Sequence, residues 1–188
     1  MAAPDRIWCW VAVSLALSSA VLAEDSAIPT FSGKGSITQA IDGEKGAVLD
    51  IGSGITMTFP PGTPVGRSRL VTLKAAAKRP SGSQVHPGFT PIGSAVDFST
   101  PISAGNQPIL FSITQKSDPR KKAERIVVAV EIGTLCNAEN KATKGKNGLC
   151  SGWEVVDAEY EAAAQRLVAR LQSTGGLRLV FGLMPADK

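Results

Sequence analysis

Short runs of alternating apolar and polar residues, separated by turns, constrain this chain more than any other feature. Ile55–Phe59 ("ITMTF") places three apolar side chains on one face and two threonines on the other. The same period of two returns at intervals of roughly 8 to 15 residues, which is typical of all-β domains. Further segments with this pattern are Arg69–Lys74, Ser94–Phe98, Pro108–Gln115, Arg125–Gly133 and Leu177–Met184. The pattern predicts an all-β fold, a single antiparallel β-sandwich of about 8–9 strands.

Two prolines and a glycine follow the first of these segments directly. Pro60 and Pro61 have no backbone N–H to donate to a neighbouring strand, so they predict that Ile55–Phe59 ends there, at a sheet edge. Gly62 tolerates a positive φ and allows the chain to turn before the next strand begins.

Arg125–Gly133 ("RIVVAVEIG") is the most continuously apolar segment. A strand that alternates has one wet face, whereas a strand without polar positions is covered on both sides. This segment therefore predicts a central strand, or one whose outer face is shielded.

Asp157–Gln172 ("DAEYEAAAQRLVARLQ") is compatible with two structures. Its alanines and charged residues favour a helix. Its second half alternates and is followed by Gly175–Gly176, as a hairpin strand would be. In an otherwise all-β chain we favour a loop or short helical turn near residues 159–164, followed by a strand.

The first 23 residues have the pattern of a secretory signal peptide. Arg6 precedes the apolar run Ile7–Ala23, and small residues lead to a predicted cleavage between Ala23 and Glu24. The run contains serines and falls below the roughly 18 to 20 apolar residues of a membrane span. We expect a secreted or periplasmic protein with no transmembrane span after signal removal.

Cleavage after residue 23 leaves 165 of the 188 residues, which is enough for one domain with a core. Residues 24–188 are therefore predicted to form a single β-sandwich domain. This part of the chain holds two cysteines, Cys136 and Cys150.

An even pair of cysteines in an exported chain predicts a disulfide. Cys136 and Cys150 would close a polar loop of 15 residues, counting both cysteines. Two thiols without a nearby histidine cannot complete a tetrahedral zinc site, so the disulfide is favoured over a metal site.

The formal net charge of +4 is modest, and aromatic residues make up only 5% of the chain. Nucleic-acid-binding surfaces concentrate basic residues and often interleave them with aromatic ones. The densest basic segment, Gln115–Arg125, contains Asp118-Pro119 and is interpreted as a solvated turn between two strands. No nucleic-acid partner and no cofactor are predicted.

Few residues in the sequence are candidates for catalysis or for ligand binding. His86 is the only histidine and lies in a proline-glycine loop, and no G-x-S-x-G elbow accompanies it. Trp153 and Tyr160 are candidates for stacking on a sugar ring, although Trp153 is better interpreted as filling the end of the core near the disulfide. Paired carboxylates need two acids facing one cleft. The candidate acids are Asp97, Glu131, Glu154 and Asp157.

Three segments within about Ala47 to Ile113 carry a resemblance to a known module: "ITMTFPPGTP", "GSAVDFSTPI" and "PILFSI". Their order resembles the ZU-five-type sandwich module of ankyrins, netrin receptors and tight-junction proteins, and Trp153 and the closing "STGGLRLVFG" fit more loosely. The resemblance implies a β-sandwich used for protein–protein contact or as a structural module, with no cofactor and no general catalytic residues.

Some relatives of that module cleave themselves at a His-Phe-Ser tripeptide. The nearest match here is Asp97-Phe98-Ser99, in which aspartate replaces the histidine. We interpret Phe98 as a core residue and Ser99 as a strand-end residue, not as a cleavage site.

Two classes of function follow from these observations. The first is an exported non-enzymatic domain that acts in protein–protein interaction or as a structural module of the cell envelope, with a protein or another envelope component as its partner. The alternative is a small exported carbohydrate-binding module or hydrolase. The alternative requires acids that converge in a pocket beside an exposed Trp153.

Overall fold

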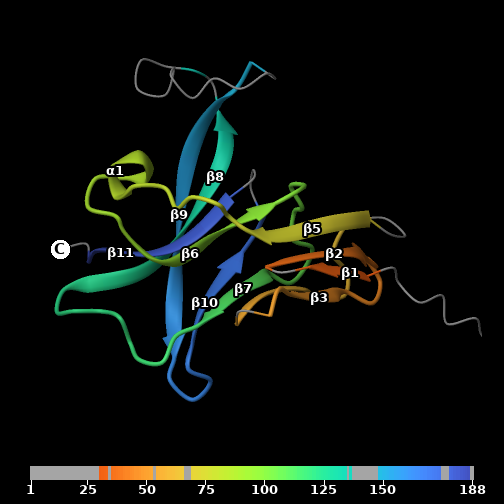
Figure 1. Ribbon diagram of the computed structural model, residues 1–188, viewed down its shortest axis with the longest axis horizontal. Coiled ribbons are helices and arrows are strands. Elements are labelled where there is room, and N and C mark those ends of the chain that lie inside the picture. Colours follow the sequence, from red (N-terminus) through yellow and green to blue (C-terminus); the bar gives the residue numbers. More distant parts are fainter. Residues whose placement is uncertain are drawn as a thin grey trace, which may run out of the picture.

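Every β-strand among the described residues belongs to one antiparallel sheet (Figure 1). The computed structural model describes residues 30–33, 35–52, 54–65, 69–134, 136, 148–174 and 178–186. The predicted signal peptide, residues 1–23, lies outside the described residues, as does Leu177. The strands are β1 (Thr30–Gly33), β2 (Ser36–Ile41), β3 (Ala47–Asp50), β4 (Ile55–Phe59), β5 (Arg69–Ala75), β6 (Thr90–Phe98), β7 (Ile109–Thr114), β8 (Glu124–Thr134), β9 (Cys150–Glu161), β10 (Arg166–Leu171) and β11 (Arg178–Pro185).

The strands follow one another across the sheet in the order β1-β2-β5-β6-β11-β8-β9-β10-β7-β4-β3. The sheet curls until its two ends lie near each other, so that it is nearly closed and barrel-like. The predicted all-β antiparallel fold is confirmed, but the predicted sandwich of 8–9 strands is corrected to one continuous sheet of eleven described strands. Alternation within a strand shows which side chains face inward, but it does not show whether the strands form one sheet or two.

The inward face of the curled sheet forms the main core, which draws side chains from β2 to β11. Two stacked aromatic pairs lie within it. The rings of Phe59 and Phe98 are 5.8 Å apart, and those of Phe111 and Phe181 are 4.9 Å apart. We refer to this set of buried residues as the inner cluster.

The strand Ile55–Phe59 was predicted correctly, and its burial alternates as expected. Its predicted position at a sheet edge was wrong, because β4 lies between β3 and β7. Phe59 is the last paired residue and lies opposite Ala47, the first residue of β3. Pro60 and Pro61 therefore follow the end of the ladder and interrupt none of its hydrogen bonds. Gly62 has a φ of 86° and makes the predicted turn.

Strand β8 lies at the centre of the sheet order, and both of its faces are covered, as its apolar sequence predicts. Its inward residues join the inner cluster, and Val127 and Ala129 point outward. A second cluster covers them on the outside and is called here the outer cluster. It contains Phe89, Ala95, Val127, Ala129, Val180 and Met184, with Val85 and Trp153 packed against it.

The connection from β5 to β6 passes over this outer cluster. It carries the short helix α1 (Gly82–Val85) and brings Phe89 onto the sheet. Gly182 of β11 leaves room for the ring, because a Cβ at that position would lie 2.3 Å from Phe89 Cζ. The sequence did not predict α1 or the shielding segment.

The loop or short helical turn predicted near residues 159–164 is present only in part, as a turn that begins later. Strand β9 continues to Glu161, residues 162–165 form a turn, and β10 follows as predicted. Inward-facing Val156, Ala158 and Tyr160 pack against the inner cluster, which requires a period of two. Packing on the sheet therefore outweighs the local helix propensity of the alanines.

Within the described part of the chain, no helix has both the length and the apolar character needed to cross a membrane.

Candidate functional site

A row of charged side chains crosses the outer face of the sheet. The register places Lys74 of β5 opposite Asp97 of β6, and Asp97 opposite Arg178 of β11. On β8, Glu131 lies one residue beyond Val130, the partner of Leu179, so it is adjacent to Arg178. Directly opposed residues of a sheet share one face, so all four side chains point outward together. We refer to them as the charged row.

The centre of the charged row is a closed ion pair. Arg178 Nε donates a hydrogen bond of 2.7 Å to Asp97 Oδ1, and both side chains remain about one-third exposed. This hydrogen bond, together with the nearby charges of Asp97 and Glu131, raises the pKa of the Arg178 guanidinium. Arg178 is therefore charged at every physiological pH.

The two ends of the charged row differ from its centre. Among the described residues, neither the Lys74 ammonium nor the Glu131 carboxylate has a hydrogen-bonding or ion-pair partner. The row thus presents an unpaired cation at one end and an unpaired anion at the other.

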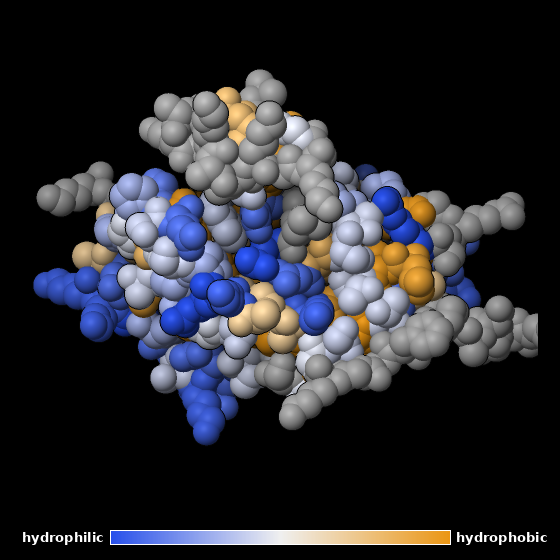
Figure 2. All heavy atoms as spheres, turned by 45° about the horizontal axis from the view of Figure 1, so that its top comes forward, coloured by the Kyte–Doolittle hydropathy of each residue, from blue (hydrophilic) through white to orange (hydrophobic). Residues whose placement is uncertain are grey.

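A pocket of about 440 Å³ lies over the charged row. Strands β5, β6, β8 and β11 position most of its lining, because their inward residues are held in the inner cluster and the alternate residues point outward. The exceptions are Phe98, which belongs to the inner cluster, and Ser99, which follows the end of β6. The lining residues are Thr72, Lys74, Asp97, Phe98, Ser99, Glu131 and Arg178. Figure 2 shows hydrophilic side chains gathered in the middle of the face that it displays.

Trp153 extends the charged row by one strand. It lies on β9 directly opposite Glu131, and so shares its face. The side chain is half-buried and packs against the outer cluster. Its predicted place at the end of the core is therefore only partly right, since Trp153 lies on the outer face and keeps some exposure beside the pocket.

Tyr160 is on the opposite face of the same strand. It packs against the inner cluster, and its hydroxyl donates a hydrogen bond of 3.2 Å to the carbonyl oxygen of Lys116. Trp153 and Tyr160 are seven positions apart, an odd number, so the pleat of β9 points them to opposite sides. The structure does not bring these two predicted stacking residues together.

The four candidate acids do not all lie in one place. Asp97 and Glu131 line the same pocket. Glu154 is exposed on the other side of β9 from Trp153, and Asp157 forms an ion pair with Arg125. The site thus combines two of the four acids with Arg178 between them.

The residues considered for nucleophilic chemistry lie apart from a catalytic arrangement. His86 is exposed, with Nδ1 2.7 Å from the carbonyl oxygen of Pro87. Ser99 Oγ accepts a hydrogen bond of 2.9 Å from the backbone N–H of Thr72. Phe98 is buried against Phe59, which confirms its interpretation as a core residue. In the described ranges, no group of three or more His, Cys, Asp or Glu residues is placed to hold a metal ion.

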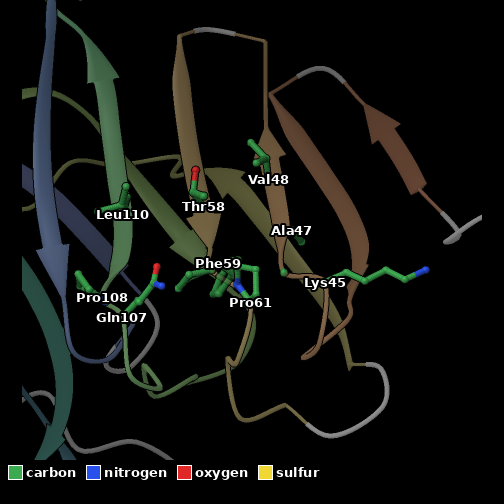
Figure 3. A pocket seen from close by; sticks show the side chains of 11 residues that line it. Lys45, Ala47, Val48, Thr58, Phe59, Pro61, Gln107, Pro108 and Leu110 are labelled. Carbon is green, nitrogen blue, oxygen red and sulfur yellow. The ribbon is translucent and has the colours of Figure 1, made fainter.

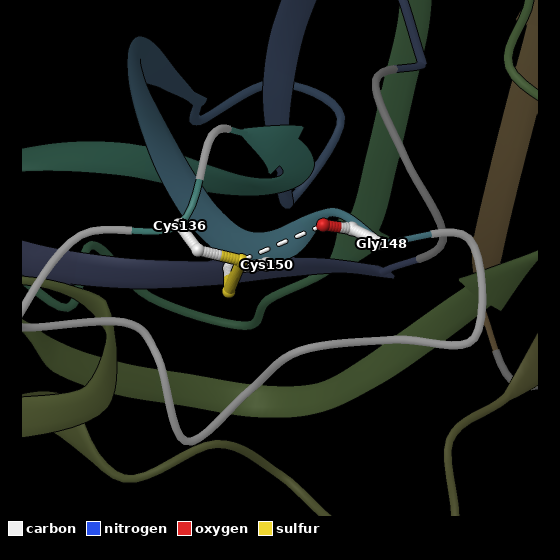
Figure 4. The surroundings of a disulfide bond; sticks show 3 residues. All are labelled: Cys136, Gly148 and Cys150. Carbon is white, nitrogen blue, oxygen red and sulfur yellow. Dashed lines mark hydrogen bonds between the residues drawn. A yellow bond between two sulfur atoms is a disulfide. The ribbon is translucent and has the colours of Figure 1, made fainter.

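The predicted disulfide is present. Cys136 and Cys150 are bonded, with their Cα atoms 5.0 Å apart, and Cys150 is the first residue of β9 (Figure 4). The Cys136 sulfur lies 3.6 Å from the carbonyl oxygen of Gly148. The bond therefore fixes the start of the strand that carries Trp153 three residues later.

The basic segment Gln115–Arg125 contains the turn between β7 and β8, as predicted. Arg120 pairs with Asp118 at 2.6 Å, and its hydrogen bonds hold the pKa of the Asp118 carboxyl below its usual value. Part of the positive charge is thus neutralised locally.

A second hollow, of about 540 Å³, lies at the β3 end of the sheet (Figure 3). Its floor is the outer face of β3, β4 and β7, where Val48, Thr58 and Leu110 lie side by side across the strands. Val48 is 55% exposed, the largest value among the exposed large apolar side chains that the structure describes. Pro60, Pro61 and Pro108 close one end of the hollow.

Sequence reasoning missed Lys74 and Arg178, which complete the charged row. Alternation alone places both on the outward face of their strands. Their proximity depends on the pairing order β5-β6-β11-β8, in which β11 inserts between segments distant in sequence. No protein-family model matches the chain, and no curated protein matches it with significant sequence similarity.

Proposed function

We propose that this protein is an exported, non-enzymatic binding module that takes a polar ligand into the pocket over the charged row. The observation that carries the proposal is the convergence of Lys74, Asp97, Arg178 and Glu131 in one pocket, beside the partly exposed Trp153. Charged groups that converge in a concave site are typical of ligand recognition. The disulfide and the apolar N-terminal run support export to a secreted or periplasmic location.

The arrangement favours binding over catalysis. A glycosidase needs two carboxylates facing each other across the reacting bond, one to donate a proton and one to attack or activate water. Here Arg178 lies between Asp97 and Glu131 and is hydrogen-bonded to Asp97. The Asp97 carboxylate is therefore held by Arg178 and does not face Glu131 across an open gap. A carbohydrate stacked on Trp153 is one ligand compatible with this site.

Fluorescence of Trp153 tests the proposal, because it is the only tryptophan outside residues 1–23. The protein, purified as a host exports it, is titrated with the low-molecular-weight fraction of an envelope extract. We expect this fraction to change the Trp153 emission of the wild-type protein, and Glu131→Gln to abolish the change. Glu154→Gln is the matched control, since Glu154 is next to Trp153 but on the opposite face. An unchanged wild-type emission, or an equal response of Glu131→Gln, would refute the proposal.

Protein–protein contact is the second candidate function, and the end of the sheet favours it. Among the described strands, β3 is hydrogen-bonded only to β4, and β2 lies near its other edge without pairing with it. The backbone groups of that edge are the ones that a strand from a partner would pair with. The hollow with Val48 adjoins this edge. The ZU-five-type resemblance implies the same kind of role, and its quoted segments include β4, β7 and the second half of β6. The ZU-five-type module is a sandwich, whereas this chain forms a single curled sheet. The proposal that the chain belongs to that family therefore depends on the three quoted segments alone.

Affinity capture with wild-type protein and a Val48→Lys variant distinguishes this second role. Loss of a specific partner in the variant, with the Trp153 response intact, would assign protein contact to the β3 edge and ligand binding to the charged row.

A further inference from the structure

The two ends of the charged row carry opposite charges, and a neutral ligand would neutralise neither of them. Lys74 lies at one end and Glu131 at the other, and among the described residues neither forms a hydrogen bond or an ion pair, although the charge of Glu131 acts on Arg178 from nearby. Between them, Asp97 and Arg178 already neutralise each other. A ligand that satisfies the whole row therefore needs an anionic group at Lys74 and a cationic group at Glu131.

The separation of the two ends sets the length of that ligand. Lys74 and Glu131 are three strand steps apart, across β5, β6, β11 and β8. At about 4.8 Å per step their positions on the sheet are roughly 14 Å apart. Both side chains are long enough to lean toward the centre and shorten this distance by several ångströms. The two charges of a free α-amino acid are too close together to reach both ends.

The centre of the charged row and its end beside Trp153 further restrict the class of ligand that fits. The Asp97–Arg178 pair offers hydrogen-bond acceptors and donors side by side. A peptide backbone carries one donor and one acceptor per residue, and so matches this alternation. At the far end Trp153 lies directly opposite Glu131. A carboxylate beside an aromatic side chain is a favourable setting for an ammonium group.

We propose that the ligand of the charged row is a short zwitterionic peptide of about three to four residues, spanning roughly 10 to 14 Å. Its amino terminus lies at Glu131 and Trp153, and its carboxylate lies at Lys74. This inference rests on the proposed function, because it names the class of polar ligand for the same pocket.

The test uses an oligoglycine series, which carries the two terminal charges without side chains. Isothermal titration calorimetry measures binding of glycine and of di-, tri-, tetra- and pentaglycine to the exported protein. We expect affinity to be highest for tri- or tetraglycine and glycine to show no binding. If glycine bound as tightly as triglycine, or if no peptide bound, the inference would be overturned.

Peptides with a blocked amino or carboxyl terminus show which terminus lies at Glu131 and which at Lys74. N-acetylation of triglycine should weaken binding to the wild type about tenfold, the loss of one charge-assisted hydrogen bond, and should have no effect on Glu131→Gln. C-terminal amidation should do the same for the wild type and have no effect on Lys74→Met. Glu154→Gln should behave as the wild type, and thermal melts of all variants check folding. Equal sensitivity of wild type and Glu131→Gln to acetylation would contradict the assigned direction.

A panel of neutral oligosaccharides separates this inference from the proposal that it depends on. Saccharide binding that requires Glu131, with no peptide binding, would overturn the zwitterionic peptide and leave the binding module standing. If neither the peptides, the saccharides nor the envelope fraction bound, both proposals would fail.

Discussion

At the scale of single residues, adjacent positions in β4 have opposite roles. Phe59 is 1% exposed and stacks on Phe98, whereas Thr58 points outward between Val48 and Leu110. Phe59→Ala should lower the free energy of unfolding by about 3–5 kcal/mol, because it opens a cavity in the inner cluster. Thr58→Ala should lower it by less than about 1 kcal/mol. Urea denaturation measures both, and equal losses would show that the inward and outward faces of β4 are misassigned.

Gly182 is needed for space. A Cβ there would lie 2.3 Å from Phe89 Cζ and 2.9 Å from the carbonyl oxygen of Thr90. Gly182→Ala should therefore cost about 1–3 kcal/mol of stability through overpacking. In a Phe89→Ala background the same substitution should cost measurably less, since the ring no longer occupies the site. A double-mutant cycle of unfolding free energies measures this coupling, and additive losses would contradict it.

At this scale the sequence was sufficient for residues whose role depends on their own strand. Phe59, Phe98 and the inward residues of β8 follow from alternation, and Gly62 follows from the prolines before it. Asp97 and Glu131 were recognisable only as acids. Their convergence depends on which strands are neighbours, and no local pattern contains that information.

At the scale of elements, the disulfide anchors the first residue of β9. Cys150 is 1% exposed and begins the strand, and Cys136 follows the end of β8. Closing a loop of 15 residues contributes about 3 kcal/mol in the chain-entropy model. We expect reduction to lower the unfolding free energy by about this amount without unfolding the sheet, because the described members of the inner cluster include neither cysteine.

Two measurements check the disulfide. Thiol labelling without reductant should modify neither cysteine, and chemical denaturation with and without reductant should give the difference in stability. Labelling of either cysteine in the native protein would contradict the bond.

Strand β9 shows where element-level prediction failed. A loop or short helical turn was predicted near residues 159–164 because alanine and glutamate favour helix, yet Glu159 to Glu161 complete the longest strand described, and the turn begins at residue 162. Tyr160 decides the outcome, since its ring packs against the inner cluster only when the chain is extended. The strands Ser36–Ile41 and Ala47–Asp50 were not predicted, because Gln39 interrupts the apolar face of the first and apolar residues occupy consecutive positions in the second.

At the scale of the whole molecule, one core unites the sheet. The buried residues of the inner cluster come from every strand from β2 to β11 except β9, whose partly buried residues pack against it. The outer cluster lies on three of the same strands, β6, β8 and β11. Unfolding should therefore be a single cooperative transition. Circular dichroism of the sheet and fluorescence of Trp153 should give the same midpoint. Two separate midpoints would indicate that the segment over the outer cluster opens independently.

The near closure of the sheet into a barrel could not be predicted from the sequence. Alternating strands and turns predicted antiparallel pairing correctly, and the central position of Arg125–Gly133 was also predicted. Whether such strands form two layers or one curled sheet depends on bulges and long strands, such as the register shift in β11 and the length of β8 and β9.

The covering of β8 on both faces restricts how this protein can change over evolutionary time. In β4, every second position faces outward and is open to polar replacement. From Ile126 to Val130 no such position exists, because the odd residues meet the outer cluster and the even ones meet the inner cluster. In a library of all single substitutions, tolerated changes should alternate along β4 and be depleted uniformly along this part of β8. Variation between descendants of this chain should accordingly collect at the outward positions of strands such as β4, and this stretch of β8 should change least.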